Sequence, residues 1–413
     1  MNKSQLAFGA IIASSALILV GCSSSGGGSS SGGKITLQEI DDYIPASPQG
    51  VAIDWLFSQY HKAFPNITIK KTGIPANELQ KLQAQATTNS LPDIAMIDNP
   101  NYPILAATGK LRSIPLASWG LQNAYIKGAQ QVVTDKQGNV GGVFIGTNTL
   151  AVLYNKDMFA KAGITTPPTT WDEFLADGKK LATPGVTGFM FSAQNNGCSA
   201  WQFNPWQWTA GGTDTTLTDP GNVKALSFLT SLVQQGVSSK DVVNQCQDQG
   251  MNALVQGQTA MIENGPWSFS TLNAASNLKW GSFPIPVPTA GDKLIVPLGG
   301  EVWTLPKTGS TANEKAAEDF LKWSQTPAIL QEFDSKLGYV PVMTSLWPAT
   351  EKANPAMTSF IDSLKFARGR TTLLGTKTPN QVAALGTAIQ QSILGQDSPK
   401  AALTSAQTQF SSQ

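Results

Sequence analysis

The chain has 413 residues, with 28 lysines and arginines against 27 aspartates and glutamates, so its formal net charge at pH 7 is only +1. This balance gives nucleic acid and anionic lipid no electrostatic attraction, and we expect neither as a partner. Charged residues make up 13% of the chain, well below the roughly 25% of an average domain. Amides, hydroxyls and 11 tryptophans take their place, which favours a neutral, hydroxyl-rich ligand over an ionic one.

The N-terminus has the pattern of a bacterial secretion signal. Lys3 supplies a positive charge, and residues 6–20 form an apolar run that is too short for a comfortable membrane span. The run ends in Leu-Val-Gly-Cys, which resembles the lipobox of bacterial lipoproteins, where the cysteine becomes the lipidated first residue of the mature protein. We therefore predict a signal peptide over residues 1–21 and lipidation of Cys22. The alternative is an ordinary secretory peptide that is cut nearby.

The rest of the chain predicts a tether followed by two domains. Residues 22–33 are almost entirely serine and glycine, and we expect a flexible tether that keeps the protein, lipid-anchored, at the extracellular face of the cell membrane. The remaining residues, about 380, exceed what one hydrophobic core usually supports. They contain no further apolar run long enough to span a bilayer.

The cysteines and the single histidine bear on redox chemistry and metals. With Cys22 assigned to lipid, Cys198 and Cys246 remain as an even pair in an oxidising location, and we predict a disulfide between them. No metal site is expected, because His61 has no cysteine or histidine near it at ligand spacing. The sequence has no Walker-type phosphate loop, and we expect no cofactor.

Strands and helices alternate over residues 35–97. Such alternation indicates an α/β domain with a largely parallel sheet, in which ligands lie beyond the carboxyl ends of the strands. Asp42 and Tyr43 follow the first strand, and Asp98 and Asn99 follow the third, so we predict that these four residues contact a ligand. The expected elements are strands at 35–40, 67–70 and 92–97 and helices at 51–64 and 76–88.

Residues 192–208 form the densest cluster of aromatic and amide side chains in the sequence. The early part has no helical or strand periodicity, so we expect a loop there, with Asn195 as a hydrogen-bond partner for a ligand. Three tryptophans within eight residues cannot all face one core. We expect Trp201 or Trp206 to stack on the ligand, while a core position is the alternative for either ring.

The stretch from residue 254 to residue 267 carries the most information. It predicts a helix that ends at Gly257, a buried strand over 259–262, and a turn from which Asn264 and Trp267 emerge. A sugar needs such a combination, because its hydroxyls want paired hydrogen bonds while its C–H face wants an aromatic plane. We therefore predict that both residues bind ligand, with Glu263 as support behind them. The alternative is a core tryptophan after an ordinary turn.

Two later segments add candidate side chains. Two glycines at 299–300 permit close backbone approach, and the carboxylate of Glu301 can accept hydrogen bonds from two sugar hydroxyls. Arg368 and Arg370 follow near the C-terminus. We expect both to lie on a solvated helix face, and the alternative is that one of them pairs with a carboxylate of the site.

Three segments, in order along the chain, resemble the maltose-binding-protein-like family, the solute-binding proteins of carbohydrate ABC transporters. They are the Tyr-Asn-Lys-Asp helix that begins at Tyr154, the Pro-Pro-x-Thr-Trp-x-Glu helix start at 167–173, and the stretch at 254–267. A Gly-x-x-Pro stretch at 338–341 resembles the same family and implies that Tyr339 lies close to the rim of the cleft.

The resemblance implies a fold class and a division into lobes. The fold is α/β and periplasmic-binding-protein-like, with two lobes joined by hinge strands and a ligand cleft between them. The N-terminal lobe would comprise residues 34–146 and 299–341, and the C-terminal lobe residues 147–298 and 342–413. Residues 147–149 and the glycines at 299–300 would then lie at hinge crossings.

The function that follows is capture of an oligosaccharide outside the cell by a monomer, and delivery to the permease subunits of an ABC importer by hinge closure, without catalysis. One alternative is a secreted glycoside hydrolase with Glu263 and Glu301 as its two carboxylates. A nucleophilic triad is nearly excluded, because the only histidine is His61. The alternative within the family is a glycerol-phosphate-type binding protein, in which Arg368 or Arg370 would hold the phosphate.

Overall fold

The computed structural model describes residues 33–75, 77–370 and 373–412. The chain divides into residues 1–33 and a compact unit of residues 34–413, and the description below concerns the second unit. The predicted signal peptide and the lipidation site Cys22 lie outside the described residues, as does nearly all of the predicted tether. In the part of the chain that is described, no helix is both long and apolar enough to cross a membrane.

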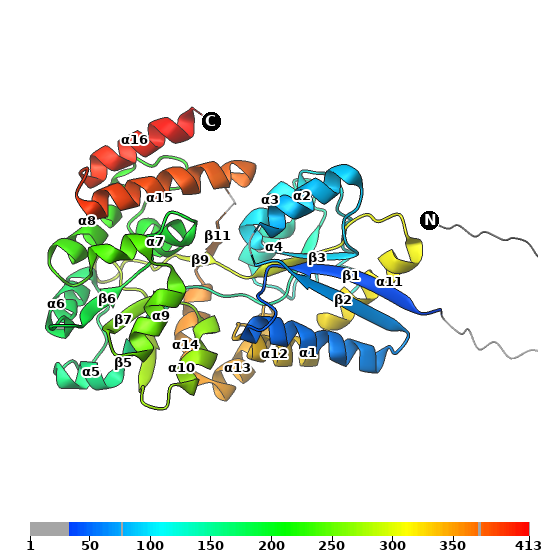
Figure 1. Cartoon of the computed structure of the whole chain (residues 1–413), viewed down its shortest axis with the longest axis horizontal. Coiled ribbons are helices and arrows are strands. Elements are labelled where there is room, and N and C mark those ends of the chain that lie inside the picture. The colour runs from blue at the N-terminus through cyan, green and yellow to red at the C-terminus, as the bar shows by residue number, and fades with distance from the viewer. Residues whose placement is uncertain (1–32, 76, 371–372, 413) are drawn as a thin grey trace, which may run out of the picture. The chain divides into compact units, whose positions relative to one another are not determined.

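The first sheet has five strands in the order β2-β1-β3-β10-β4. Strand β1 runs parallel to β2 and β3, whereas β10 runs antiparallel to both β3 and β4. The apolar run in β3 is fully buried because helices cover both faces of the sheet (Figure 1). The strands are β1 (Ile35–Asp41), β2 (Ile67–Gly73), β3 (Ile94–Asp98), β4 (Gly142–Phe144) and β10 (Glu301–Thr304).

Six α-helices belong to this first lobe. In Figure 1, α1 and α12 lie below the sheet, and α2 and α3 lie above it. The first of them starts three residues earlier than the predicted helix, because Ser47 caps its N-terminus and Pro48 occupies its first turn. The helices are α1 (Pro48–Ala63), α2 (Glu78–Thr88), α3 (Tyr102–Ala106), α4 (Lys127–Val133), α11 (Thr311–Ser324) and α12 (Pro327–Leu337), with the 3₁₀ turn η1 (Asn99–Asn101).

The second sheet has four strands in the order β6-β7-β5-β8. Its strand β7 is buried at all six positions and pairs parallel with β6 and antiparallel with β5, which in turn pairs antiparallel with β8. The two sheets, each with its own helices, make the fold two-lobed and α/β, as predicted. The strands are β5 (Ala151–Asn155), β6 (Thr187–Met190), β7 (Thr259–Asn264) and β8 (Trp280–Phe283).

The helices of the second lobe include the last two of the chain. Helices α15 and α16 pack on each other and on α8, as Figure 1 shows. The Thr170 capping box at the start of α6 matches the predicted helix start. The elements are α5 (Lys156–Lys161), α6 (Trp171–Leu181), α7 (Cys198–Thr209), α8 (Pro220–Gln234), α9 (Gln247–Val255), α10 (Phe269–Ala274), α15 (Thr378–Leu394) and α16 (Pro399–Ser411), with η2 (Lys240–Asn244), η3 (Pro266–Ser268) and η6 (Gly375–Lys377).

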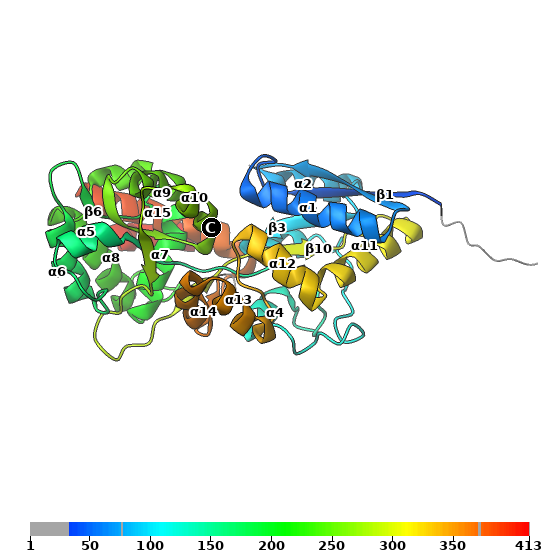
Figure 2. The same ribbon diagram turned by 90° about the horizontal axis from the view of Figure 1, so that it is seen from below.

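A further segment connects α12 to α15. Its helices α13 and α14 lie side by side in Figure 2, and their buried side chains, such as Trp347 and Phe360, belong to a hydrophobic core that contains residues of both sheets. A two-stranded parallel sheet follows. The elements are η4 (Thr344–Leu346), α13 (Trp347–Ala353), η5 (Pro355–Met357), α14 (Thr358–Leu364), β9 (Val296–Leu298) and β11 (Ala367–Gly369).

Three chain segments lie side by side where the chain passes from one sheet to the other. Thr147 forms an antiparallel bridge with Val340, and Asn148 forms one with Gly299. Both backbone hydrogen bonds of each bridge are made, at 2.7–3.2 Å. Gly300 has a φ of +113°, and a β-carbon there would collide with the carbonyl oxygen of Gly146, so this crossing requires glycine. We propose these segments as the hinge.

Candidate ligand-binding site

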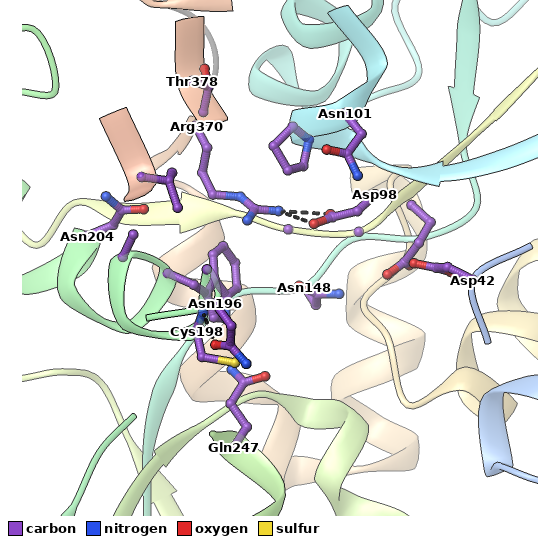
Figure 3. A pocket seen from close by; sticks show the side chains of 18 of the residues that line it. Asp42, Asp98, Asn101, Asn148, Asn196, Cys198, Asn204, Gln247, Arg370 and Thr378 are labelled. Carbon is purple, nitrogen blue, oxygen red and sulfur yellow. Dashed lines mark hydrogen bonds and ion pairs between the residues drawn. The ribbon is translucent and has the colours of Figure 1, made fainter. Parts of the chain in front are cut away.

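A cavity of about 700 Å³ is lined by residues of both lobes. Figure 3 shows carboxylate, amide and guanidinium groups that point into it from elements far apart in the sequence. The size is that of a site for a small molecule of a few rings. The lining residues used below are Asp42, Tyr43, Asp98, Asn148, Asn195, Asn196, Trp201, Gln247, Trp267, Glu301, Tyr339 and Arg370.

Three carboxylates reach the cavity from one edge of the first sheet. Asp98 is the last residue of β3, and Glu301 is the first residue of the antiparallel strand β10, which places the two directly opposite each other. Asp42 follows β1. The carboxyl ends of parallel strands meet at one sheet edge, and β10 begins at the edge where β3 ends. The predicted gathering of Asp42 and Asp98 arises in this way.

Burial changes the acidity of two of these groups. It raises the pKa of Glu301 to about 7, and the negative charge of Asp98 adds to the effect. The pKa of Asp42 is also raised well above its usual value. Burial is the largest cause, and repulsion from Glu301 is the second. One oxygen of each, Oδ1 of Asp42 and Oε2 of Glu301, has no hydrogen-bond partner among the described residues. These oxygens are therefore available to hydroxyl donors of a ligand.

Two tyrosines complete this side of the cavity. The hydroxyl of Tyr339 donates to Oε1 of Glu301 at 3.0 Å, and it lies 3.2 Å from the hydroxyl of Tyr43. Burial and then the Glu301 charge raise the pKa of both phenols well above the usual value. Both are thus neutral hydrogen-bond donors at physiological pH, and they orient the carboxylate.

Trp267 presents an aromatic ring from the turn after β7. The ring lies over Gly265, where a β-carbon would overlap the six-membered ring, so glycine at this position is what allows the conformation. The backbone of Trp267 also contacts Gly338, which has a φ of +74°. Half-buried and packed against the cores of both lobes, the indole leaves part of its surface to the cavity.

Trp201, on α7, lines the opposite part of the cavity together with Arg370. The guanidinium carbon lies 4.4 Å from the centroid of the indole, and its Nη2 donates to both oxygens of Asp98 at 2.8 and 2.9 Å. Figure 3 shows this arginine extending toward Asp98. Arg368 makes a similar arrangement with Asp214. The expectation of a solvated helix face was wrong, because Arg368 lies in strand β11, Arg370 directly follows it, and both pair with carboxylates.

Amide side chains and a disulfide shape the remaining wall. Cys198 and Cys246 are joined by a disulfide, with their α-carbons 5.7 Å apart. The bond ties the start of α7 to the start of α9, next to the loop that carries Asn195 and to Gln247. The amide nitrogen of Asn195 donates to Thr387 on α15 at 2.9 Å, and its carbonyl oxygen lies against Gly386 of the same helix.

Trp206 was predicted as a possible ligand contact, and this expectation is corrected. Its side chain is fully buried, and its indole nitrogen donates to Oε2 of Glu263 at 2.8 Å. Five residues along an α-helix turn the side chain about 140° away from Trp201, so the two rings cannot share the cavity. Glu263 is buried and accepts this bond, so the contact it makes is with Trp206 and not with Asn264 or Trp267, which it was predicted to support.

Asn99 and Asn264 were predicted to bind ligand, but neither lines the cavity. The amide of Asn99 donates to the carbonyl oxygens of Leu298 and Gly300 at 3.3 and 2.9 Å and thus secures the crossing. Asn264 accepts a hydrogen bond from the backbone of Gly265 and donates to Gln247. The amide nitrogens of both residues are used within the protein and neither side chain lines the cavity, so we withdraw them from the site.

Other lining residues were not singled out from the sequence as ligand contacts. Asn148 was noted only as part of a hinge crossing, and its place between two threonines gives no sign of a ligand contact. Gln247 comes directly after Cys246, and the predicted disulfide to Cys198 places it close to the loop that carries Asn195. Within the described residues, no group of three or more histidine, cysteine, aspartate or glutamate side chains is arranged to hold a metal ion.

Comparison with known proteins adds an independent line of evidence. Residues 55–359, about three quarters of the chain, match the family of bacterial extracellular solute-binding proteins. A maltooligosaccharide ABC transporter solute-binding lipoprotein of Streptococcus pneumoniae is 23% identical over 375 residues, which cover 87% of this chain and 85% of that protein.

Two further relatives are matched over shorter stretches. A putative binding protein of Brucella abortus is 27% identical over 255 residues, which cover 57% of this chain and 60% of that protein, so the chain spans about three fifths of the length of this relative. An sn-glycerol-3-phosphate-binding periplasmic protein of Yersinia pestis is 25% identical over 222 residues, covering 50% of this chain and 49% of that protein.

The fold is also that of a solved structure. MalE3 of T. maritima, described as maltose bound, superimposes with a TM-score of 0.80 at 20% identity, over 91% of this chain and 99% of that chain. At this level of identity, the likeness establishes the two-lobed fold.

Proposed function

The chain belongs to the family of bacterial extracellular solute-binding proteins, and on this premise we propose that it captures a neutral oligosaccharide outside the cell and delivers it to an ABC importer. Relatives and structural neighbours of this family are transport proteins. The relative from Streptococcus pneumoniae, which matches 87% of the chain, is named for maltooligosaccharide. Glucose oligomers are therefore the first ligand class to test.

The observation that carries the proposal is the pairing of two unlike surfaces in one cavity. Buried carboxylates with free oxygens, oriented by Tyr339, suit the hydroxyl edge of a sugar, because hydrogen bonds to ionised acceptors are strong. The ring of Trp267 suits the C–H face of the same sugar. A purely apolar ligand would leave the carboxylates without partners, at a high cost in desolvation.

The mechanism is a change in the relative position of two rigid lobes. The first sheet holds the carboxylates, and Trp267 and Trp201 come from elements of the second lobe. A ligand that contacts both sides stabilises the arrangement in which they are close together, which is how differential binding drives hinge closure. The crossing at Thr147 and Asn148, with Gly299 and Gly300, absorbs the change. The closed form is then the one that the permease subunits recognise.

We include the predicted attachment in this proposal. Lipidation of Cys22 and the tether that follows would keep a monomeric protein at the extracellular face of the membrane, close to the importer. The related lipoprotein of Streptococcus pneumoniae supports this assignment. Metabolic labelling with a radioactive fatty acid tests it, and the expected result is label in the protein and none in the Cys22→Ala variant.

The glycoside hydrolase alternative loses its pair of carboxylates. It required Glu263 and Glu301 on either side of a sugar, but Glu263 does not line the cavity and accepts the indole N–H of Trp206. Of the carboxylates that line the cavity, Asp42, Asp98 and Glu301 come from one edge of the first sheet, and the fourth, Asp214, is paired with Arg368. This geometry favours recognition of hydroxyls over attack from two sides of a glycosidic bond.

A glycerol-phosphate ligand is disfavoured by charge. A phosphate needs positive groups that are free to bind it, yet Arg370 is paired with Asp98, and Arg368 is paired with Asp214. The ionised form of Glu301 would also repel an anion in the cavity.

Titration calorimetry on the purified protein with maltose to maltoheptaose, and with glycerol 3-phosphate, tests the proposal. We expect stoichiometric binding of at least one oligosaccharide, with the sugar recovered unchanged. Release of shorter sugars would establish the hydrolase instead. Binding of glycerol 3-phosphate alone would establish the phosphate ligand.

A further inference from the structure

One aromatic face in the cavity is already covered by the protein itself. The Arg370 guanidinium lies over Trp201 at 4.4 Å, well within the range of about 6 Å for a cation–π contact. The indole, although it lines the cavity, is only 8% exposed. A sugar ring that stacks on Trp201 needs the surface that the guanidinium occupies.

The guanidinium of Arg370, which covers the Trp201 ring, is held in place by Asp98. Two hydrogen bonds, at 2.8 and 2.9 Å, fix the guanidinium to both oxygens of Asp98. Asp98 belongs to the first sheet, whereas Trp201 belongs to α7 of the second lobe, so the arginine joins the two sides. Moving Arg370 off the ring therefore requires breaking a charge-assisted pair as well as a stacking contact.

The chain contains a matched arrangement whose ring and guanidinium do not line the cavity, although its carboxylate does. Arg368 lies 3.9 Å over the ring of Trp208 and pairs with Asp214 at 3.1 Å. The two tryptophans are seven residues apart and thus share one face of α7, and the two arginines are two residues apart on one side of a strand. Trp208, however, is only 2% exposed and does not line the cavity. Stacking there is internal packing, whereas at Trp201 it takes up ligand-binding surface.

We propose that Arg370 is a specificity-determining residue, whose planar guanidinium covers Trp201 and thereby limits the length of oligosaccharide that the cavity accepts. The inference rests on the proposed function. With Trp201 covered, Trp267 is the aromatic platform left to the ligand, and a short sugar satisfies it. A longer ligand gains a second stacking contact only when the cover is removed.

The first test needs no ligand. Hydroxyl-radical footprinting of the purified full chain, read by peptide mass spectrometry, measures the oxidation of each tryptophan. We expect oxidation of Trp201 to rise severalfold in both Arg370→Gln and Arg370→Lys, with Trp267 unchanged. Lysine keeps the positive charge opposite Asp98 but has no planar group. The Arg370→Lys variant therefore distinguishes the effect of covering the Trp201 ring from the effect of the charge. An unchanged Trp201 in both variants would overturn the proposal.

The second test measures ligand length by calorimetry with maltose through maltoheptaose. We expect the ratio of the affinities for the longest and shortest sugars to rise by about tenfold in both Arg370 variants, the scale of one aromatic contact. Arg368→Gln serves as the matched control. It removes the equivalent stack on Trp208 and should leave the ratio as it is in the wild type.

The outcomes separate the two proposals. If the wild type binds oligosaccharides but the ratio stays constant in the Arg370 variants, or rises only in Arg370→Gln, the inference about the cover fails and the proposed function stands. If no oligosaccharide binds to any variant, the proposed function fails, and the claim about ligand length fails with it. Loss of all sugar binding in both Arg370 variants, with thermal stability retained, would identify Arg370 as a direct ligand contact and overturn its role as a cover.

Discussion

The two sides of the cavity are built in different ways. The first lobe supplies ionisable and hydroxyl groups that stand at strand ends, such as Asp98 and Glu301, whose backbones are fixed by direct pairing between β3 and β10. The second lobe supplies rings and amides from helix starts, turns and a connecting segment, such as Trp267 from a turn and Trp201 from α7. One side is thus held by a sheet, and the other by local packing.

This difference matches the demands of a sugar. Hydrogen bonds depend steeply on distance and angle, so the groups that make them benefit from a rigid strand edge. Aromatic stacking tolerates lateral displacement, and it can be supplied by side chains on less regular backbone. We therefore expect substitutions on the two sides to have different consequences for binding, for stability and for their dependence on pH.

The disulfide tests whether the helix-built side depends on a covalent tie. Cys198 and Cys246 are separated by 48 residues, and closing a loop of that length stabilises the folded state by about 4 kcal/mol in the chain-entropy treatment. We expect the free energy of unfolding of the double variant Cys198→Ala/Cys246→Ala to be lower by that amount, so that the variant unfolds at a lower urea concentration. Urea titration followed by circular dichroism measures it. An unchanged midpoint would show that the sheet, the helices and their packing suffice.

Replacing the exposed ring tests the aromatic side directly. Trp267→Ala removes the platform, and we expect a loss of affinity for the best oligosaccharide of about 100-fold, the scale of a central aromatic contact in a binding site. Gly265→Ala should act in the same direction, because its β-carbon displaces the ring. Calorimetry measures both effects. Retained affinity in Trp267→Ala would place the ligand elsewhere.

Replacing a carboxylate tests the strand-built side. Glu301→Gln keeps the shape of the side chain and its contact with Tyr339, but it removes the charged acceptor. We expect a loss of about tenfold in affinity, since a hydrogen bond to a charged group contributes about 1.5–3 kcal/mol and a neutral one about half. The matched control is Glu318→Gln, which removes a carboxylate that pairs with Arg112 outside the cavity. Equal losses in the two variants would deny Glu301 a specific role.

The dependence of stability on pH tests the acidity of the same carboxyl group. Burial and the charge of Asp98 raise the pKa of Glu301 to about 7, so the folded protein holds a proton that the unfolded chain releases at about 4.3. Its contribution to stability is therefore fully present below about pH 4 and is lost as the pH rises toward 7. We expect the melting temperature to fall over this window less steeply in Glu301→Gln than in the wild type. Parallel curves would contradict the shift.

Much of the first side was predictable from the sequence because its signals are local. An apolar strand followed by polar residues is visible at Asp98, and the rule that ligands lie beyond strand ends does the rest. The position of Glu301 opposite Asp98 was not predictable, since it depends on pairing between residues about 200 apart, with no trace in either segment alone.

The second side was harder to predict because it depends on side-chain direction. The cluster of tryptophans was visible, but which of them faces the cavity depends on where the helix starts, and Trp206 turned out to point into the core. Asn264 emerges from the predicted turn, yet its amide serves the backbone of that turn. The contact between Arg370 and Asp98 joins residues 272 apart, and only the folded chain brings them together.

The position of β10 in the first sheet also determines the order in which the molecule can be completed. Strand β4, at residues 142–144, pairs within its sheet only with β10, at residues 301–304, and the whole second sheet lies between them in the sequence. As the chain is synthesised, the first sheet keeps an unpaired edge until the second sheet has been made. Contacts of such long range slow folding and leave strand edges open to aggregation. The first lobe, which begins first along the chain, is thus completed only after the second sheet has been made, and the second lobe ends with α15 and α16 at the C-terminus.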